Sequence, residues 1–213
     1  SDTPTTIVSN LKDDGYTCIA MHPYYETGWS RNLVYPHIGF DEMHFIDYFD
    51  QTKILREYIT DQELYDKIIR RYENRKNNEK LFFMGITMQN HGGYTETYDN
   101  FPENYYKVGR SYTDANQYLS LVHESDEAVK NLISYFSKVD DPVEIIFFGD
   151  HQPSLNSNFY PILNGKGLTG LTEDELEKLY TVPFFIWTNY DTPEETVDIT
   201  SLDYLSTMAL ERA

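Results

Sequence analysis

Four short apolar runs along the chain have the length and composition of buried β-strands. They are Tyr16–Met21, Leu81–Thr87, Val143–Phe148 and Val182–Thr188. Each run is shorter than a typical helix, and its apolar residues are nearly continuous instead of alternating with polar ones. We therefore expect strands that are covered on both faces.

Amphipathic segments that predict helices alternate with these runs. They cover Thr5–Gly15, Asp61–Asn77, Tyr112–Val139, Thr172–Tyr180 and Ser201–Leu210. In the second segment, Leu64, Ile68 and Tyr72 recur at the four-residue spacing of one helix face. In the fourth, Thr172 is followed three residues later by Glu175, which is the pattern of a capping box.

This alternation of strands and helices predicts an α/β fold, a sandwich built on a mainly parallel sheet. Ligands bind to such sheets beyond the carboxyl ends of the strands. A loop rich in aromatic and polar residues runs from His22 to about Asp50, directly after the first predicted strand. The chemistry is therefore expected near the strand ends.

The composition is that of a globular domain with an acidic surface. Hydrophobic residues make up 40% of the 213 residues, aromatic residues 15%, and the formal net charge is −18. No apolar run reaches the roughly 18 residues that a membrane-spanning helix needs. The negative charge argues against nonspecific nucleic-acid binding, and an anionic substrate would require a local cationic site. The single cysteine, Cys18, lies in an apolar run and is expected to be a buried thiol.

Polar residues follow three of the predicted strands. His22 follows the first, Gln89-Asn90-His91 follows the second, and Gly149-Asp150-His151 follows the third. Because the carboxyl ends of parallel strands meet at one edge of the sheet, we expect these three groups to converge.

Asp150 and His151 form the pair best suited to a divalent metal. Carboxylate and imidazole groups both bind ions such as Mn²⁺ or Zn²⁺. Neighbouring residues share one ion only where the strand has ended and the chain turns, and Gly149 and Pro153 permit such a turn. The alternative is a capping aspartate beside a surface histidine.

The loop after the first strand brings together His22, Trp29 and Arg31. The forked guanidinium group suits phosphate or sulfate oxygens, and an indole ring stacks on a glycerol or sugar edge or holds the guanidinium. His91 precedes two glycines, which let a backbone approach a ligand closely. The alternatives are that Trp29 belongs to the core, that Arg31 pairs with one of the many acids, and that His91 lies in an ordinary turn.

Taken together, these motifs resemble those of lipoteichoic acid synthases and related phosphoglycerol transferases, which are sulfatase-like members of the alkaline phosphatase superfamily. The segment His22–Arg31, followed by Gly39-Phe40-Asp41, is similar to the substrate loop of that family. Asn90-His91-Gly92 is similar to the segment that carries its second substrate histidine, and Gly149-Asp150-His151 to its metal motif. The motifs occur in the family's order over nearly the whole chain.

The resemblance implies a sulfatase-like α/β/α sandwich and an extracellular, metal-dependent enzyme. Such an enzyme transfers glycerophosphate from phosphatidylglycerol to a glycerol-phosphate or glycan acceptor. Asp150 and His151 would ligate Mn²⁺ or Mg²⁺, with Zn²⁺ as a further candidate. The pocket for the phosphoglycerol group would be lined by His22, Trp29, Arg31 and His91. An N-terminal membrane domain would hold the enzyme at the outer face of the cell membrane, next to the lipid headgroups.

The sequence departs from the family pattern in two places. Pro23-Tyr24 stand where the best-known synthases have small polar residues, so the donor and the acceptor stay open. The family's nucleophilic threonine and a glutamate ligand lie upstream of the matched region. None of Thr3, Thr5 and Thr6 follows a strand that would place a nucleophile. We therefore expect residues 1–213 to be one partial catalytic domain that binds metal weakly and is inactive alone.

Three other functions are compatible with the sequence. The first is a sulfatase, or a phosphomonoester or phosphodiester hydrolase, of the same superfamily. The second is a noncatalytic module that binds an anionic cell-wall polymer and does so without a metal. The third is a structural domain in which the three motifs are coincidental.

Overall fold

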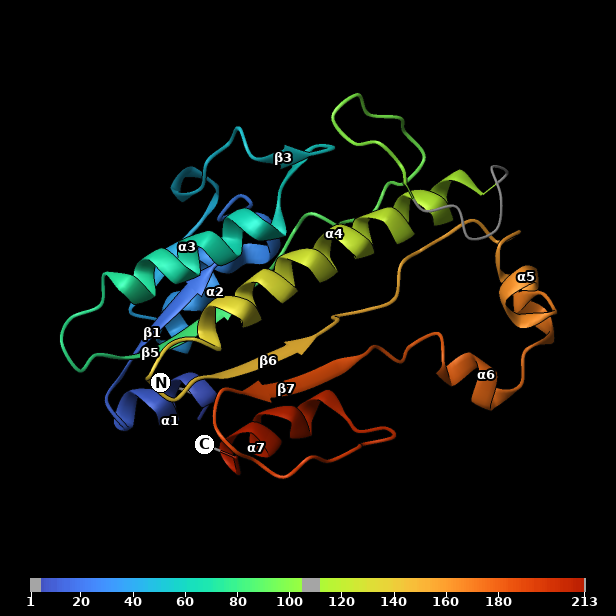
Figure 1. The fold of residues 1–213 in the computed structure, drawn as a ribbon. Helices are drawn as coiled ribbons and strands as arrows, with labels where there is room; N and C mark the ends of the chain where they lie inside the picture. Colours follow the sequence, from blue (N-terminus) through green and yellow to red (C-terminus); the bar gives the residue numbers. More distant parts are fainter. Residues whose placement is uncertain (1–4, 105–111, 213) are drawn as a thin grey trace.

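Helices and strands alternate along the chain as the sequence predicts (Figure 1). The computed structural model describes residues 5–104 and 112–212. The strands are β1 (Tyr16–Met21), β2 (Glu42–His44), β3 (Ile54–Leu55), β4 (Tyr58–Ile59), β5 (Lys80–Gly85), β6 (Glu144–Phe148) and β7 (Phe184–Thr188). The helices are α1 (Ile7–Asp13), α2 (Arg31–Ile38), α3 (Asp61–Glu73), α4 (Thr113–Phe136), α5 (Tyr160–Asn164), α6 (Glu173–Glu177) and α7 (Leu205–Leu210). Short 3₁₀ turns lie at Gly28–Ser30, Ile46–Tyr48, Leu168–Gly170 and Leu202–Tyr204.

The main sheet is parallel and has the order β2-β1-β5. In its register Ile19 of β1 lies opposite Glu42 of β2 and Phe83 of β5. The other long strands, β6 and β7, form an antiparallel pair in which Ile146 lies opposite Ile186. The predicted α/β architecture with a mainly parallel sheet is confirmed, while β7 runs against its neighbour.

The first strand is buried on both faces by helices, which makes this part of the fold a three-layer sandwich. Cys18 and Ala20 pack with Val8 of α1 and Tyr35 of α2. The alternate residues of β1 belong to the larger cluster beneath α3 and α4. This two-sided burial explains why the strand is a continuous apolar run. The expectation of a buried Cys18 thiol is confirmed, since its side chain is fully covered.

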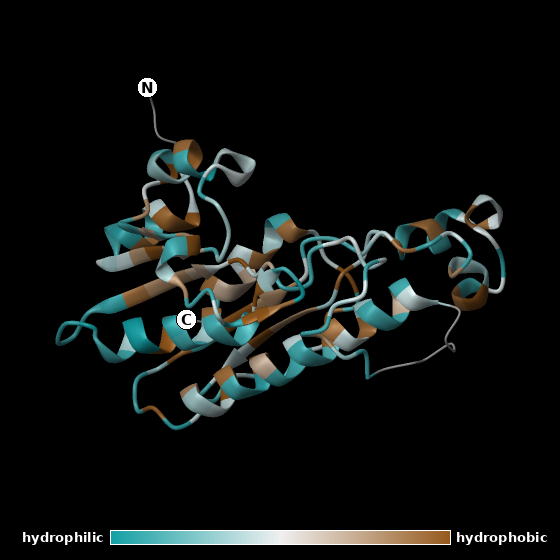
Figure 2. Cartoon of the chain, turned by 90° about the horizontal axis from the view of Figure 1, so that it is seen from above, coloured by the Kyte–Doolittle hydropathy of each residue, from teal (hydrophilic) through white to brown (hydrophobic). Residues whose placement is uncertain are grey.

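Helices α3 and α4 lie side by side over the strands (Figure 1). The predicted stripe of α3 is confirmed at Leu64 and Ile68, which are buried in the same cluster as Leu132 and Phe136 of α4. Strands β5 and β6 both pack against this cluster, through Phe83 and partly buried residues of β6 such as Ile145. Figure 2 shows the hydrophobic strands beneath helices with hydrophilic outward positions. One helical layer therefore covers both sheets, although β5 and β6 are not hydrogen-bonded to each other.

Side-chain caps account for several helix starts. Thr6 and Ser9 form a capping box at α1, and Thr172 and Glu175 form the predicted one at α6. The region from His22 to Asp50, expected to be a loop, instead contains α2 and β2. These were missed because β2 has only three residues and α2 contains a proline at Pro36, which is atypical of a helix interior.

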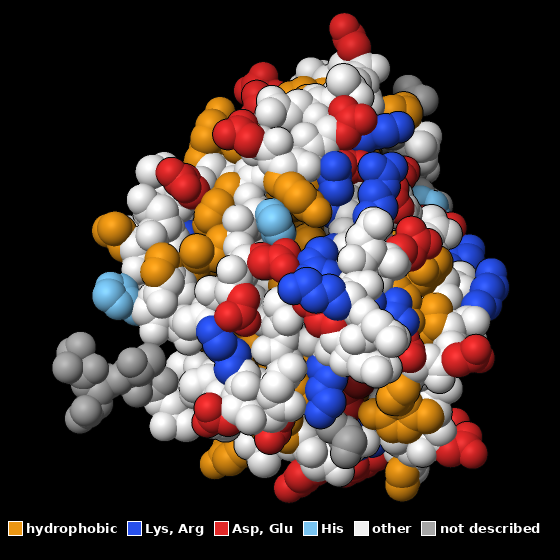
Figure 3. Space-filling model, turned by 90° about the vertical axis from the view of Figure 1, so that its left-hand side faces the viewer, with side chains coloured by type: hydrophobic (Ala, Val, Ile, Leu, Met, Phe, Trp, Pro, Cys, Tyr) orange, Lys and Arg blue, Asp and Glu red, His pale blue; other side chains and the backbone are white. Residues whose placement is uncertain are grey.

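Basic side chains are interspersed with acidic ones on the face shown in Figure 3. One ion-pair group joins Arg71 to Glu42 at 2.8 Å and to Glu79 at 2.9 Å, which ties α3 to β2 and to the residue before β5. Among the described helices, none is both long and apolar enough to cross a lipid bilayer.

Candidate active site at the ends of the parallel strands

His22 connects the carboxyl ends of β1 and β5. Its backbone N–H donates to the His44 carbonyl at 2.9 Å, and its ring Nδ1 lies 2.9 Å from the Ile86 carbonyl oxygen. A carbonyl only accepts hydrogen bonds, so Nδ1 carries the proton and Nε2 has a free lone pair. The side chain is 1% exposed, and Nε2 is buried without a hydrogen-bond partner among the described residues.

His22 is neutral at physiological pH. Burial is the main cause that lowers the pKa of its imidazole to about 4. The hydrogen bond to the Ile86 carbonyl acts in the opposite direction, and the charges of Arg31 and His91 add to the lowering. The unprotonated Nε2 is therefore a buried hydrogen-bond acceptor without a partner among the described residues.

Trp29 and Arg31 form the outer wall of the site. The Trp29 side chain is 60% exposed, and the Arg31 guanidinium carbon lies 4.4 Å from the centroid of its ring. Arg31 donates from Nε to the Tyr35 hydroxyl at 3.0 Å and from Nη1 to the Gly28 carbonyl at 3.2 Å. Within the described chain no carboxylate forms an ion pair with Arg31. The alternatives of a core tryptophan and an acid-paired arginine are therefore not what the structure has.

The backbone at this wall is strained. Trp29 has a φ of 52° and Ser30 a φ of 57°, both in the left-handed region that non-glycine residues avoid. Strain of this kind costs on the order of 1–3 kcal/mol per residue and is concentrated at functional sites. The strained turn directs the indole towards His22 and His91.

His91 completes the group of side chains that we call the strand-end cluster: His22, Tyr24, Trp29, Arg31, Tyr58 and His91. The Trp29 ring lies 6.1 Å from the His22 ring and 6.0 Å from the His91 ring, between centroids. The Tyr58 hydroxyl is 3.4 Å from His91 Nδ1. The structure thus brings the four predicted substrate residues into one place.

Tyr24 and Tyr58 are not among the site residues predicted from the sequence. The Tyr24 ring lies 6.0 Å from Trp29 and 6.3 Å from Tyr58, and the two tyrosines line a cavity of about 110 Å³. Tyr24 has a weak sequence signal, since it lies two residues after His22. Tyr58 has none, because it reaches the site from the β3–β4 hairpin.

The Asp150–His151 pair follows the end of β6, where the chain bends as predicted. Glycine at position 149 allows this bend to lie close to another segment, since a Cβ there would come within 3.1 Å of the Val182 Cβ. The Asp150 and His151 side chains are 84% and 76% exposed. In the described part of the chain, no hydrogen bond, ion pair or ring contact joins them to the strand-end cluster.

The donor atoms of this pair are compatible with one shared cation. His151 Nδ1 lies 2.9 Å from the Gln152 carbonyl, which leaves Nε2 as the free ring nitrogen, 3.6 Å from an Asp150 oxygen. Metal-bound histidines commonly donate their other N–H to a backbone carbonyl in this way. Two donors each about 2.1 Å from an ion lie at most about 4 Å apart. No group of three or more such ligands occurs among the described residues, so the pair supplies only part of a coordination sphere.

A polar hollow lies beside the segments that follow His91 and His151 in the chain. It has a volume of about 500 Å³ and is lined by residues 93–95, after His91, and by Ser154, Asn156 and Asn158, after His151. Its wall also includes residues of the α4 start. The hollow therefore adjoins both the His91 loop and the segment that follows the predicted metal pair.

Thr5 and Thr6, two of the early threonines considered as nucleophiles, lie just before the first residue of α1. The Thr6 hydroxyl accepts a hydrogen bond from the Ser9 N–H at 3.1 Å and caps α1, and Thr5 is exposed beside it. Thr3 lies outside the described residues.

Comparison with known proteins assigns the family. The sequence profile of the sulfatase family, described as "Sulfatase", matches residues 1–212. A capsular polysaccharide biosynthesis protein, RkpI, from Rhizobium meliloti (strain 1021) is 33% identical over 149 residues, 69% of this chain and 26% of that protein.

Two solved structures share the fold. One is the phosphoglycerol transferase GacH of Streptococcus pyogenes, in complex with sn-glycerol-1-phosphate, with a TM-score of 0.76 and 22% identity over 99% of this chain and 52% of that one. The other is the lipoteichoic acid synthase LtaP of Listeria monocytogenes, with a TM-score of 0.68 and 20% identity over 86% of this chain and 46% of that one. The chain thus spans between a quarter and about half of the length of these relatives. It belongs to the sulfatase family, and it shares its fold with the phosphoglycerol transferase GacH and the lipoteichoic acid synthase LtaP.

Proposed function

We propose that this chain is the substrate-binding part of an extracellular, metal-dependent phosphoglycerol transferase of the lipoteichoic acid synthase type. The observation that carries the proposal is the Arg31 guanidinium, stacked on an exposed Trp29 and free of any described acid partner. In a chain with a net charge of −18, a cation left unneutralised at the mouth of a histidine-lined site favours an anionic ligand.

The cluster is suited to a phosphate that carries a glycerol group, more than to a bare anion. Arg31 offers its remaining N–H groups to phosphate oxygens. His22 Nε2 is a neutral acceptor at pH 7, which repels anionic oxygens but accepts a hydrogen bond from a hydroxyl. Trp29 and Tyr24 supply apolar faces for the glycerol carbons. A ligand with both an anionic end and a hydroxyl end satisfies all three groups.

The proposed cofactor is a divalent metal, Mn²⁺ or Mg²⁺, with Zn²⁺ as the alternative. Asp150 and His151 would hold it through a carboxylate oxygen and Nε2, together with ligands that the described residues do not provide. When bound, such an ion neutralises phosphoryl charge and favours the deprotonated form of a hydroxyl nucleophile.

The reaction proposed for the whole protein is transfer of glycerophosphate from a glycerophospholipid headgroup to a glycerol-phosphate or glycan acceptor. The names of the two structural relatives support phosphoglycerol as the transferred group, and RkpI supports a glycan setting. We further propose that these 213 residues bind the headgroup without turnover. Single-turnover labelling of the chain by a phosphoglycerol donor would contradict that part of the proposal.

The test is calorimetric titration of the chain with sn-glycerol-1-phosphate, inorganic phosphate and sulfate. We expect glycerol phosphate to bind most tightly. Arg31→Ala should weaken it by about tenfold or more, because a charge-assisted bond to the anion contributes roughly 1.5–3 kcal/mol. Arg70→Ala is the matched control, since Arg70 is an exposed arginine on α3 outside the site.

Two results would contradict the proposal. If sulfate binds as tightly as glycerol phosphate, the sulfatase alternative is favoured. If an anionic polymer binds equally well after chelation and in His151→Ala, the noncatalytic module is favoured.

A further inference from the structure

Arg56 is a buried arginine that makes no ion pair with any described carboxylate. It is 5% exposed and occupies the first position of the two-residue turn between β3 and β4. Its φ is 55°, in the left-handed region, although such turns normally place glycine or asparagine there. A buried, charged side chain in a strained turn is maintained only if its contacts in the folded chain compensate for the strain.

Those contacts converge on the loop that carries His91. Arg56 Nη2 donates to the Gln89 and His91 carbonyls, both at 2.8 Å, and Nη1 reaches the Gly93 carbonyl at 3.4 Å. Nη1 also donates to the Gln117 side-chain oxygen of α4 at 3.2 Å. One guanidinium thus contacts alternate carbonyls along the loop 89–93, which no smaller donor could span.

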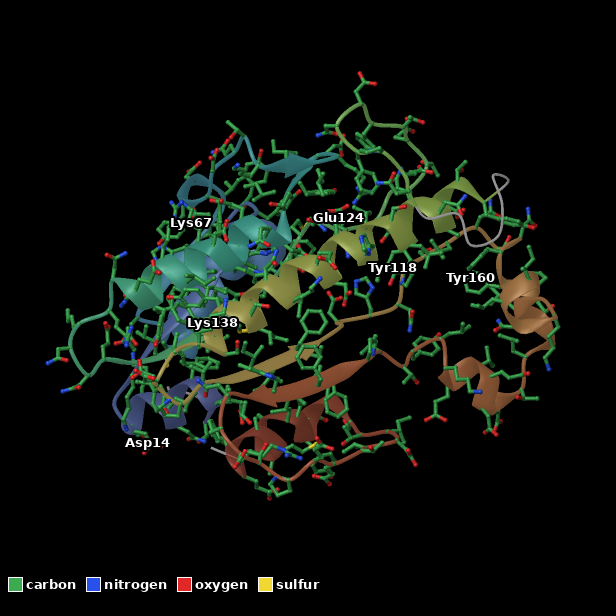
Figure 4. All side chains as sticks on the ribbon, viewed as in Figure 1. Asp14, Lys67, Tyr118, Glu124, Lys138 and Tyr160 are labelled. Carbon is green, nitrogen blue, oxygen red and sulfur yellow. The ribbon has the colours of Figure 1, made fainter. Side chains whose placement is uncertain are left out.

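The charge of Arg56 is held by carbonyl dipoles and by aromatic faces. Its guanidinium carbon lies 5.4 Å from the Tyr94 ring centroid and 5.7 Å from that of Tyr58. Tyr94 also donates its hydroxyl to the Asn90 carbonyl at 2.7 Å and packs on Tyr118, which Figure 4 labels on α4. The loop backbone is therefore fixed to α4 and to the hairpin at the same time.

A second anchor holds the side chains of the loop. The Ser125 hydroxyl accepts from the Asn90 side chain at 2.8 Å and donates to Asp61 at 2.6 Å. Burial raises the pKa of Asp61 to about 6, against the effect of that hydrogen bond. This anchor acts on Asn90, whereas Arg56 alone among the described side chains contacts the His91 carbonyl.

We propose that Arg56 is a positioning residue, which sets the place of the His91 imidazole in the strand-end cluster through the backbone carbonyls of residues 89–93. Arg56 is only 5% exposed, so we do not expect it to touch the ligand. The His91 ring lies against Trp29 and Tyr58, and the Arg56 guanidinium also lies near the Tyr58 ring. This inference rests on the proposed phosphoglycerol site for its ligand, but not for its geometry.

The test compares Arg56→Lys with Arg75→Lys in the whole chain. Both arginines stack on tyrosine rings, but Arg75 pairs with Asp141 away from the loop. Lysine keeps the positive charge but lacks the planar guanidinium group, whose several N–H donors reach different carbonyls at once. We expect Arg56→Lys to shift the His91 imidazole resonance, identified with His91→Gln, and to leave the His37 resonance unchanged. We expect the affinity for sn-glycerol-1-phosphate to fall about tenfold, equivalent to ~1.4 kcal/mol.

A double-mutant cycle separates positioning from general stability. In a His91→Ala background, Arg56→Lys should cause little further loss of affinity, because the group it positions is absent. Equal loss in both backgrounds, or an unmoved His91 resonance, would overturn the inference.

Arg56→Gln, which keeps an uncharged amide donor, is the second variant. If neither Arg56→Lys nor Arg56→Gln unfolds cooperatively, the inference is also overturned, since Arg56 would then be required for the fold itself. If the unsubstituted chain does not bind glycerol phosphate, the proposed function fails, and the His91 resonance alone decides the role of Arg56.

Discussion

Arg31 stacks on the exposed face of Trp29, with 4.4 Å between its guanidinium carbon and the ring centroid. The pair stands on a backbone turn in which Trp29 and Ser30 both have positive φ. The stacking restricts the guanidinium before a ligand arrives, so less conformational freedom is lost when an anion binds.

Removing the indole should weaken anion binding without unfolding the chain. We expect Trp29→Ala to lower the affinity for sn-glycerol-1-phosphate about two- to fivefold, because an exposed cation–π contact contributes ~0.5–1 kcal/mol. Calorimetric titration measures this. Tyr180→Ala is the control, since Tyr180 is an exposed aromatic residue outside the cluster. An affinity unchanged by Trp29→Ala would show that Arg31 does not depend on the stack.

His22 should make the stability of the chain depend on pH. Its pKa is lowered from 6.5 to about 4 in the folded chain, so the unfolded chain binds more protons between these values. The stabilisation is fully present above pH 6.5 and is lost as the pH falls towards 4. We expect unsubstituted protein to lose roughly 2–3 kcal/mol more than His22→Gln between pH 7 and pH 4.5. Urea unfolding at both pH values measures the difference.

Asp61 acts in the opposite direction over part of this range. Burial raises its pKa from 3.8 to about 6, so its contribution falls as the pH rises through that interval. Comparing each variant with the unsubstituted protein at the same pH cancels this term. His37→Gln is the control, because His37 is exposed. Parallel profiles for unsubstituted protein and His22→Gln would show that His22 is not held neutral.

Metal binding should depend on His151. We expect His151→Ala and Asp150→Asn each to weaken Mn²⁺ binding by about tenfold or more, because only two protein donors are provided by the pair. Electron paramagnetic resonance of free Mn²⁺ measures this directly, with His37→Ala as the control. Equal Mn²⁺ binding by His151→Ala and the unsubstituted chain would place the metal elsewhere.

Position 149 should tolerate no larger residue unless Val182 is reduced. An added Cβ would come within 3.1 Å of the Val182 Cβ, so we expect Gly149→Ala to lower the free energy of unfolding by about 1 kcal/mol. The double variant Gly149→Ala/Val182→Ala should lose less free energy of unfolding than the sum of the two single variants, as measured by urea unfolding. Additive effects of the two substitutions would mean that the bend after β6 is not limited by this contact.

Many elements could be predicted because their pattern is local. A continuous apolar run predicts the two-sided burial of β1, and the spacing of Leu64 and Ile68 predicts the buried face of α3. The cap at Thr172 depends on residues three apart. Each of these depends only on near neighbours in the chain, so one sequence is sufficient.

The direction of β7 and the separation of β6 from the parallel sheet could not be predicted in this way. An apolar run fits a parallel or an antiparallel neighbour equally well, and pairing depends on where the connecting segments lie in space. The same limit applies to Arg56 and Tyr58, whose roles arise from a hairpin that meets a loop more than 30 residues further along the chain.

The sequence was sufficient to predict the four long strands and the helices between them, the histidines that follow three of those strands, and the residue types suited to phosphate and metal. The folded structure was needed to show that Nε2 is the unprotonated nitrogen of His22, that Trp29 is exposed and stacked on Arg31, and that Arg56 contacts the His91 loop. The physical reason is that periodicity records which face of an element is buried, whereas tautomer, exposure and carbonyl contacts depend on partners that only the folded chain brings together.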